Sequence, residues 1–103
     1  MNARTKALQI PRHVKEAVAE RDSFDGWPCC VLCGSTEGFP EAHYIPRSQG
    51  GLGIEENIVT LCRPCHHDFD QSDKRAEIKP QLRQYLQGKY PEWDESKLIY
   101  RRP

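Results

Sequence analysis

The stretch ENIVTLCRPCHHDFD, residues 56–70, decides the fold, because an apolar β-branched run leads directly into a cysteine pair and two histidines. Isoleucine, valine and threonine in succession predict a β-strand. The polar run after Cys62 predicts a helix, since Pro64 suits a first helical turn. Upstream, residues 30–34 read CVLCG, and residues 42–51 read AHYIPRSQGG. The fold therefore depends on what the two cysteine pairs do.

Each cysteine pair has two residues between its sulfur ligands: Cys30 with Cys33, and Cys62 with Cys65. This spacing lets one turn direct both sulfur atoms at a single point. Four thiolates form a closed tetrahedral zinc site, which is structural rather than catalytic. We therefore predict one structural Zn²⁺ at these four cysteines.

Two other interpretations of the cysteines are weaker. A redox CxxC is expected in a βαβ context, and the chain has no such pattern. Cys29 could replace Cys30 as a ligand, but its spacing to Cys33 is less suitable. A small buried or free thiol is the simpler interpretation of Cys29.

Composition limits the class of protein. The 103 residues correspond to a single domain, residues 1–103, and a hydrophobic fraction of 37% with a mean hydropathy of −0.80 predicts a thin core that leans on metal. No signal-peptide or membrane-spanning apolar run is present, so we expect a cytoplasmic protein with reduced cysteines and no membrane partner. The formal net charge is zero, so contact with a polyanion would need a local basic patch.

The pattern along the chain predicts an α+β fold. Residues 1–9 are expected to form a loose arm, residues 11–21 a helix, residues 30–70 the motif core and residues 90–103 a tail. A second helix is predicted over residues 77–87, with Gly88 as its stop. Helices would then flank a small hairpin at both ends of the core.

Three polar side chains are expected to converge beside the zinc. His43 would lie in one strand of the hairpin, Asn57 would lead into the other, and His66 follows the last zinc ligand. Histidine has the pKa of a general base near neutral pH, and a second imidazole can bind a divalent metal ion. Asn57 could bond across the loop and fix the orientation of His43. Each residue alone has a simpler structural role, but their combination indicates a catalytic site.

These motifs resemble the HNH endonuclease family, over Cys30 to about Asp70. The resemblance implies a ββα-metal fold, here with a four-cysteine zinc ribbon, and hydrolysis of DNA phosphodiester bonds with Mg²⁺ or Mn²⁺. It implies that His43 is the general base, Asn57 the orienting residue and His66 a metal ligand. It also implies attack of water on phosphorus, with a 5′-phosphate left on the product.

The sequence departs from the family at Ala42, where an Asp or His that binds metal often precedes the catalytic histidine. Glu41 does not obviously replace it, because neighbouring strand residues point to opposite faces. Asp70 is four residues after His66, so both fall on one face of a helix. We hypothesise that His66 and Asp70 together bind the catalytic ion.

The remaining polar and aromatic residues carry weaker predictions. Arg47 is a candidate phosphate contact, because guanidinium matches phosphate bidentately. Basic residues near both ends of the chain are as well explained by solvated faces as by DNA binding. Trp27, Trp93 and Tyr90 are interpreted as core or packing residues.

Two classes of function are compatible with this sequence. One is a metal-dependent DNA endonuclease, and the other is a non-catalytic zinc-ribbon module that binds nucleic acid or a protein partner. The first is favoured, because a scaffold needs none of His43, Asn57 and His66. By analogy, the setting is a phage or a bacterium.

Overall fold

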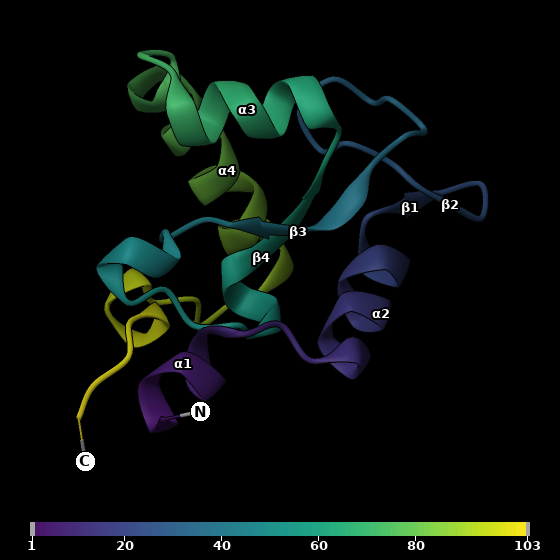
Figure 1. Cartoon of the computed structure of the whole chain (residues 1–103). Helices are drawn as coiled ribbons and strands as arrows, with labels where there is room; N and C mark the ends of the chain where they lie inside the picture. Colours follow the sequence, from purple (N-terminus) through teal and green to yellow (C-terminus); the bar gives the residue numbers. More distant parts are fainter. Residues whose placement is uncertain (1, 103) are drawn as a thin grey trace.

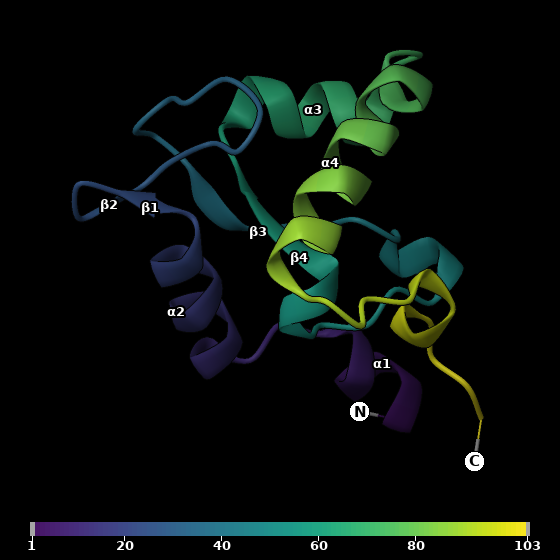
Figure 2. The same cartoon turned by 180° about the vertical axis from the view of Figure 1, so that it is seen from behind.

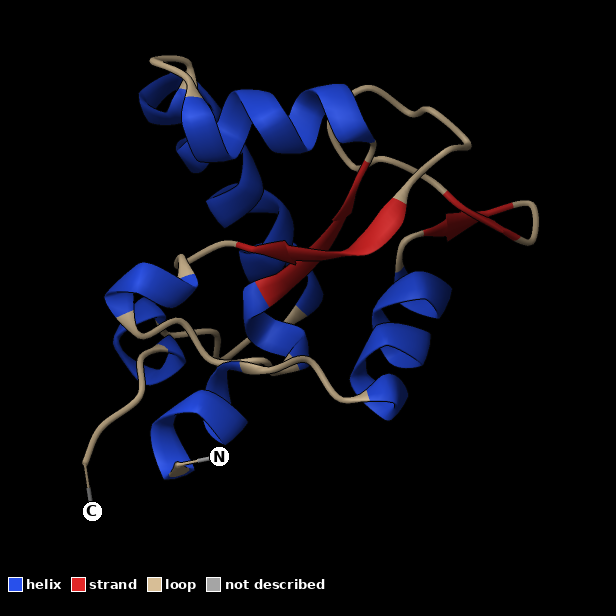
Figure 3. Cartoon of the chain, in the orientation of Figure 1, coloured by secondary structure: helices blue, strands red, loops and turns tan. Residues whose placement is uncertain are grey.

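The computed structural model describes residues 2–102 and confirms the α+β class. At its centre lies an antiparallel hairpin of β3 (Phe39–His43) and β4 (Ile58–Leu61), around which the helices are arranged (Figures 1 and 3). Ala42 faces Val59 in the register and His43 faces Ile58, with an irregularity between Phe39 and Ala42. All four residues of β4 are buried, as its β-branched sequence predicts.

The helix after the hairpin completes a ββα unit. α3 (Arg63–Gln71) begins directly after β4, with Pro64 in its first turn, where the missing N–H costs no hydrogen bond. α4 (Arg75–Lys89) follows and lies in front of the hairpin in the reverse view (Figure 2). Leu82 and Leu86 of α4 are fully buried in the main core with Phe69 of α3. None of the helices in the described part of the chain has the length and apolar character needed to span a membrane.

The end of α4 differs from the prediction at Gly88. The helix runs through this glycine and ends at Lys89, one residue before an extended Tyr90. Tyr90 precedes Pro91, and the proline ring disfavours the helical conformation of the residue before it. Proline therefore sets the end of the helix, one residue after the glycine.

The prediction of a loose arm over residues 1–9 is wrong for residues 3–8, which form α1 (Ala3–Leu8). The side chain of Asn2 caps this helix by accepting a hydrogen bond from the Thr5 N–H, and Leu8 is buried. The chain at Gly53 passes so close that a Cβ there would lie 1.8 Å from the Gln9 carbonyl oxygen. The arm is therefore docked against the loop that follows β3.

The tail also packs on the body, within the described residues 90–102. Leu98, at the end of the short helix Glu95–Leu98, is buried in the main core. The indole of Trp93 donates a hydrogen bond to the Glu56 carbonyl oxygen and packs edge-on against the ring of Tyr44. This agrees with the prediction of a packing role for Trp93, and Tyr90 is partly buried as well.

Trp27 is not a core residue, and this prediction is wrong. It lies in a small hairpin of β1 (Ser23–Phe24) and β2 (Trp27–Pro28) that projects from the side of the molecule (Figure 1). Trp27 is 66% exposed and its cross-strand neighbour Phe24 is 79% exposed. In the sequence, a tryptophan next to proline and cysteine indicates a packing residue. In the structure, the tight turn between β1 and β2 directs its side chain away from the core.

A buried ion pair fastens α2 (Arg12–Arg21) to the hairpin. Arg21 Nε lies 2.8 Å from Asp22 Oδ1, and both side chains are nearly inaccessible. Arg21 also donates hydrogen bonds to the carbonyl oxygens of Glu55 and Ile58, while Asp22 accepts one from the Thr60 N–H of β4. The pair therefore links α2 to both ends of β4.

We expect Asp22→Ala to lower the free energy of unfolding by about 3–5 kcal/mol, because it leaves the buried Arg21 charge without its partner. Arg12→Ala is the matched control, since the Arg12–Glu16 pair is exposed and should contribute less than about 1 kcal/mol. Urea denaturation of the two variants measures both values. Equal stability of the two variants would contradict the role given to Asp22.

Candidate active site and metal centre

The four predicted zinc ligands lie together. The sulfur atoms of Cys30, Cys33, Cys62 and Cys65 are all within 4.8 Å of one another, and those of Cys33 and Cys62 are 3.6 Å apart. Tetrahedral Zn–S bonds of about 2.3 Å place ligand sulfurs about 3.8 Å apart. The group therefore fits a zinc ion.

The local backbone favours thiolate at one ligand of this cluster. Burial opposes the charge on Cys30, but the backbone N–H groups of Cys33, Cys62 and Leu32 lower the pKa of its thiol to about 7. Cys29 lies outside the cluster, and its thiol donates to the Trp27 carbonyl oxygen at 3.3 Å. The cluster ties the loop before β3 to the start of α3 and so fixes α3 relative to the hairpin.

His43 ends β3 and is held by the N-terminal helix. Its Nε2 lies 2.9 Å from the carbonyl oxygen of Leu8, and a carbonyl can only accept, so Nε2 carries the proton. The other ring nitrogen, Nδ1, then has a free lone pair. Burial lowers the pKa of His43, as do the nearby Arg47 and His66, while the Leu8 bond and Asp70 oppose the shift. A neutral imidazole at pH 7 is the form that can accept a proton.

The side chain of Asn57 forms no hydrogen bond with His43 but holds the loop that follows it. The Asn57 Oδ1 accepts from the Ile45 N–H at 2.8 Å, and its Nδ2 donates to the Ile45 and Leu52 carbonyl oxygens. Its backbone carbonyl also accepts from the Tyr44 N–H. Asn57 is fully buried, so it fixes the backbone immediately after His43.

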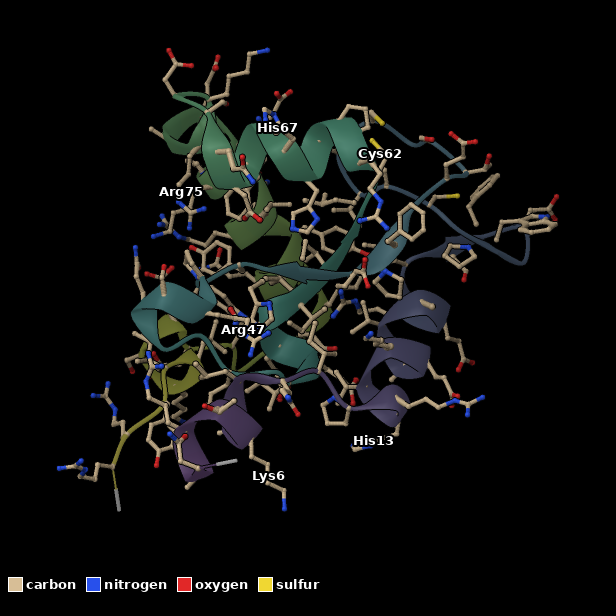
Figure 4. All side chains as sticks on the ribbon, viewed as in Figure 1. Lys6, His13, Arg47, Cys62, His67 and Arg75 are labelled. Carbon is tan, nitrogen blue, oxygen red and sulfur yellow. The ribbon has the colours of Figure 1, made fainter. Side chains whose placement is uncertain are left out.

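His66 and Asp70 face each other along α3. The His66 Nε2 lies 2.9 Å from an Asp70 carboxylate oxygen, as expected for residues four apart on one helical face. Both line an open cleft of about 870 Å³ together with His43, Glu41, Arg47 and Arg75. Arg47 lies beside the hairpin in Figure 4, whereas His67 stands on the outer side of α3.

The side chain at position 42, where the family often has a metal ligand, does not face the cleft. Ala42 is fully buried in the main core, so its side chain points away from the cleft. Glu41 lines the cleft on the same side as His43, where Lys15 and Arg63 pair with its carboxylate at 3.8 and 3.5 Å. Among residues 2–102, the four cysteines are the only group of three or more His, Cys, Asp or Glu side chains close enough to share a metal ion.

Sequence reasoning missed two features of this cleft. His43 is held by the backbone carbonyl of Leu8. Every residue has this group, so the sequence does not indicate the contact and only the tertiary structure reveals it. Lys15 and Arg75 belong to the basic residues near the two ends of the chain, for which the sequence favoured no specific role, yet both line the cleft. Arg83 of the same runs lies elsewhere and contacts Glu95 and Tyr44.

Comparisons with known proteins show the family of the chain. A family model described as HNH endonuclease matches residues 30–82, about half of the chain. A curated protein named Anaredoxin, from Nostoc sp. (strain PCC 7120), is 30% identical over 50 residues. The match covers 48% of this chain and 66% of that relative, so the chain spans less than two thirds of the relative's length. The matched family region includes all four clustered cysteines, His43, Asn57, His66 and Asp70.

Proposed function

Because the chain belongs to the HNH endonuclease family, we propose that it is a metal-dependent enzyme that hydrolyses phosphodiester bonds of DNA. The observation that carries the proposal is the state of His43. Its Nε2 is bound to the Leu8 carbonyl oxygen, which leaves Nδ1 as a proton acceptor on a cleft shared with His66 and Asp70. A scaffold would have no need for a histidine held in this way.

In the proposed reaction, Nδ1 of His43 takes a proton from a water molecule that attacks phosphorus in line with the leaving 3′ oxygen. The P–O3′ bond breaks and the leaving 3′ oxygen takes a proton from a second water molecule, so the products carry a 5′-phosphate and a 3′-hydroxyl. Arg47 lines the cleft and would bind the phosphate by charge-assisted hydrogen bonds. Asn57 acts indirectly, because it holds the backbone after His43.

His66 and Asp70 are the residues that would hold the catalytic ion. An imidazole and a carboxylate fit Mn²⁺ or Mg²⁺, provided that water and phosphate oxygens complete the shell. When bound, such an ion supplies stabilisation of the negative charge on the leaving oxygen. Because the protein would supply only these two ligands, we expect the catalytic ion to bind weakly. We also propose a cytoplasmic location, because a reducing compartment keeps cysteines available as metal ligands.

A non-catalytic module that binds nucleic acid or protein is the second candidate. The cleft favours it, because among the described residues the side chains that line the cleft form no group of three possible metal ligands. The two candidates differ in one product. The nuclease leaves nicks, and the binding module does not.

Product analysis of supercoiled plasmid tests the nuclease proposal. The zinc-loaded chain with Mn²⁺ should convert plasmid to nicked circles that DNA ligase seals, because the proposed reaction leaves a 5′-phosphate and a 3′-hydroxyl. Nicks that ligase cannot seal would contradict the mechanism. Intact plasmid at every ion concentration would favour the binding module.

We expect Asp70→Asn to raise the Mn²⁺ concentration needed for half-maximal cleavage about tenfold or more, because a neutral amide binds the ion less strongly than a carboxylate. Stability should change little, since Asp70 is exposed. Asp68→Asn on the same helix is the matched control, because Asp68 does not line the cleft. Identical metal titrations of Asp70→Asn and the wild type would remove Asp70 from the ligand set.

A further inference from the structure

The hairpin of β1 and β2 exposes two aromatic side chains that the core does not use. Phe24 and Trp27 stand opposite each other in the strand register and are the two most exposed large hydrophobic residues of the described chain. Single exposed apolar residues are ordinary on protein surfaces, but paired exposed aromatic rings on a projecting element indicate contact with a partner.

The hairpin is held rigidly at its base. Asp25 and Gly26 form its turn with φ values of 53° and 86°, the left-handed conformation that Asp-Gly hairpin turns favour. One strand begins after the buried Asp22, whose carbonyl oxygen accepts from the Cys29 N–H at 3.0 Å. The other strand leads into Cys30 of the metal cluster. The two rings are therefore presented by a fixed element.

A groove runs from this hairpin past the metal cluster to the start of α3. It has a volume of about 880 Å³, and its lining includes Trp27, Phe39, Arg63 and Glu37 together with Cys33, Cys62 and Cys65 of the metal cluster. The Arg63 guanidinium lies 4.1 Å from the centre of the Phe39 ring. Arg63 also pairs with Glu41, and Glu41 with Lys15, and the last two line the cleft of His43. The Arg63–Glu41 pair therefore places the aromatic groove next to the candidate active site.

The cleft and the groove differ in charge. The cleft presents Lys15, Arg47 and Arg75, which suit phosphates. The groove presents aromatic rings beside one arginine, one glutamate and three cysteines of the metal cluster, so it offers stacking surface without a net positive charge that would attract phosphate. Nucleobases stack on aromatic rings and on arginine planes in a manner that tolerates any sequence.

We propose that the Phe24–Trp27 hairpin and its groove bind unpaired nucleobases of the nucleic-acid chain whose backbone occupies the cleft. The inference deepens the proposed function and rests on it, because it assigns the enzyme a preference for DNA with unpaired bases next to the cleavage position. Paired bases are stacked inside the duplex and cannot cover the exposed rings.

Binding measured without added Mg²⁺ or Mn²⁺ tests this inference separately from cleavage. The probes are a duplex with a short single-stranded gap, the same duplex with the gap filled, and the same gap built from abasic residues. We expect Trp27→Ala to weaken binding to the base-containing gap about tenfold, and to leave binding to the filled and abasic probes unchanged. Trp27→Phe keeps an aromatic ring and should bind the gap nearly as well as the wild type.

Phe24 provides a second, matched comparison. Phe24→Tyr keeps the ring and should retain binding, whereas Phe24→Leu keeps apolar surface without a ring and should lose it. Stacking of a base on Trp27 should also quench indole emission, and this quenching should be absent from Trp27→Phe, in which Trp93 is the remaining tryptophan. If all variants bind the three probes as the wild type does, the hairpin inference is wrong while nucleic-acid binding stands. If self-association changes instead, the surface serves a protein partner. If the wild type binds none of the probes, the proposed function fails as well.

Discussion

Cys62→Ser is expected to release the metal and to abolish cooperative unfolding. Cys62 ends the central hairpin and precedes α3, so its thiolate joins the two parts of the ββα unit. Zinc binding by four-ligand structural sites corresponds to an apparent free energy of about 10–16 kcal/mol at pH 7, whereas whole domains are stable by about 5–15 kcal/mol. Loss of one ligand therefore removes a term comparable to the entire stability.

Cys29→Ser is the matched control for this prediction. Cys29 is adjacent to the cluster but outside it, so this variant should keep one zinc per chain and the wild-type melting temperature. Zinc content by elemental analysis and thermal melts by circular dichroism measure both variants. A zinc-free Cys62→Ser chain that melts cooperatively at the wild-type temperature would show that the metal is not required for folding.

His43→Ala is expected to reduce cleavage by about 10²–10⁴-fold, the contribution that a positioned general base typically makes. The variant should keep its zinc, because His43 is separate from the four cysteines. Loss of the bond to the Leu8 carbonyl should loosen α1 without unfolding the core, since that helix is docked through Leu8 and Gly53 as well.

His67→Ala is the matched control for the loss of a histidine. His67 is exposed on α3 and lies outside the cleft lining (Figure 4). Its removal should leave the cleavage rate within about twofold of the wild type, since surface substitutions away from a site have small effects. A large loss in His67→Ala would mean that the roles of the two α3 histidines have been assigned wrongly.

The features that local sequence patterns specify could be predicted. The β-branched run of β4, the proline at the start of α3 and the spacing of the two cysteine pairs each carry their own physical signal. The pairing of His66 with Asp70 follows from helical periodicity alone. These signals specify the ββα unit and its metal cluster without any knowledge of the rest of the chain.

The features that depend on tertiary contacts could not be predicted. Residues 3–8 have no helical period, and α1 forms because Leu8 is buried and Asn2 caps its start. The carbonyl that holds His43 is a backbone group, so its residue type carries no information. Trp27 is apolar and would be placed in the core by composition, yet a two-residue turn directs it to solvent.

The most direct test compares nicking of supercoiled plasmid by the zinc-loaded wild type and His43→Ala, with Mn²⁺ added or omitted. Omission of the catalytic ion, in place of a strong chelator, leaves the structural zinc bound. We expect nicking by the wild type only with Mn²⁺. The nicking rate of His43→Ala should be lower by at least about 100-fold at equal zinc content. Nicking by His43→Ala at the wild-type rate would contradict the assignment of His43 as the general base.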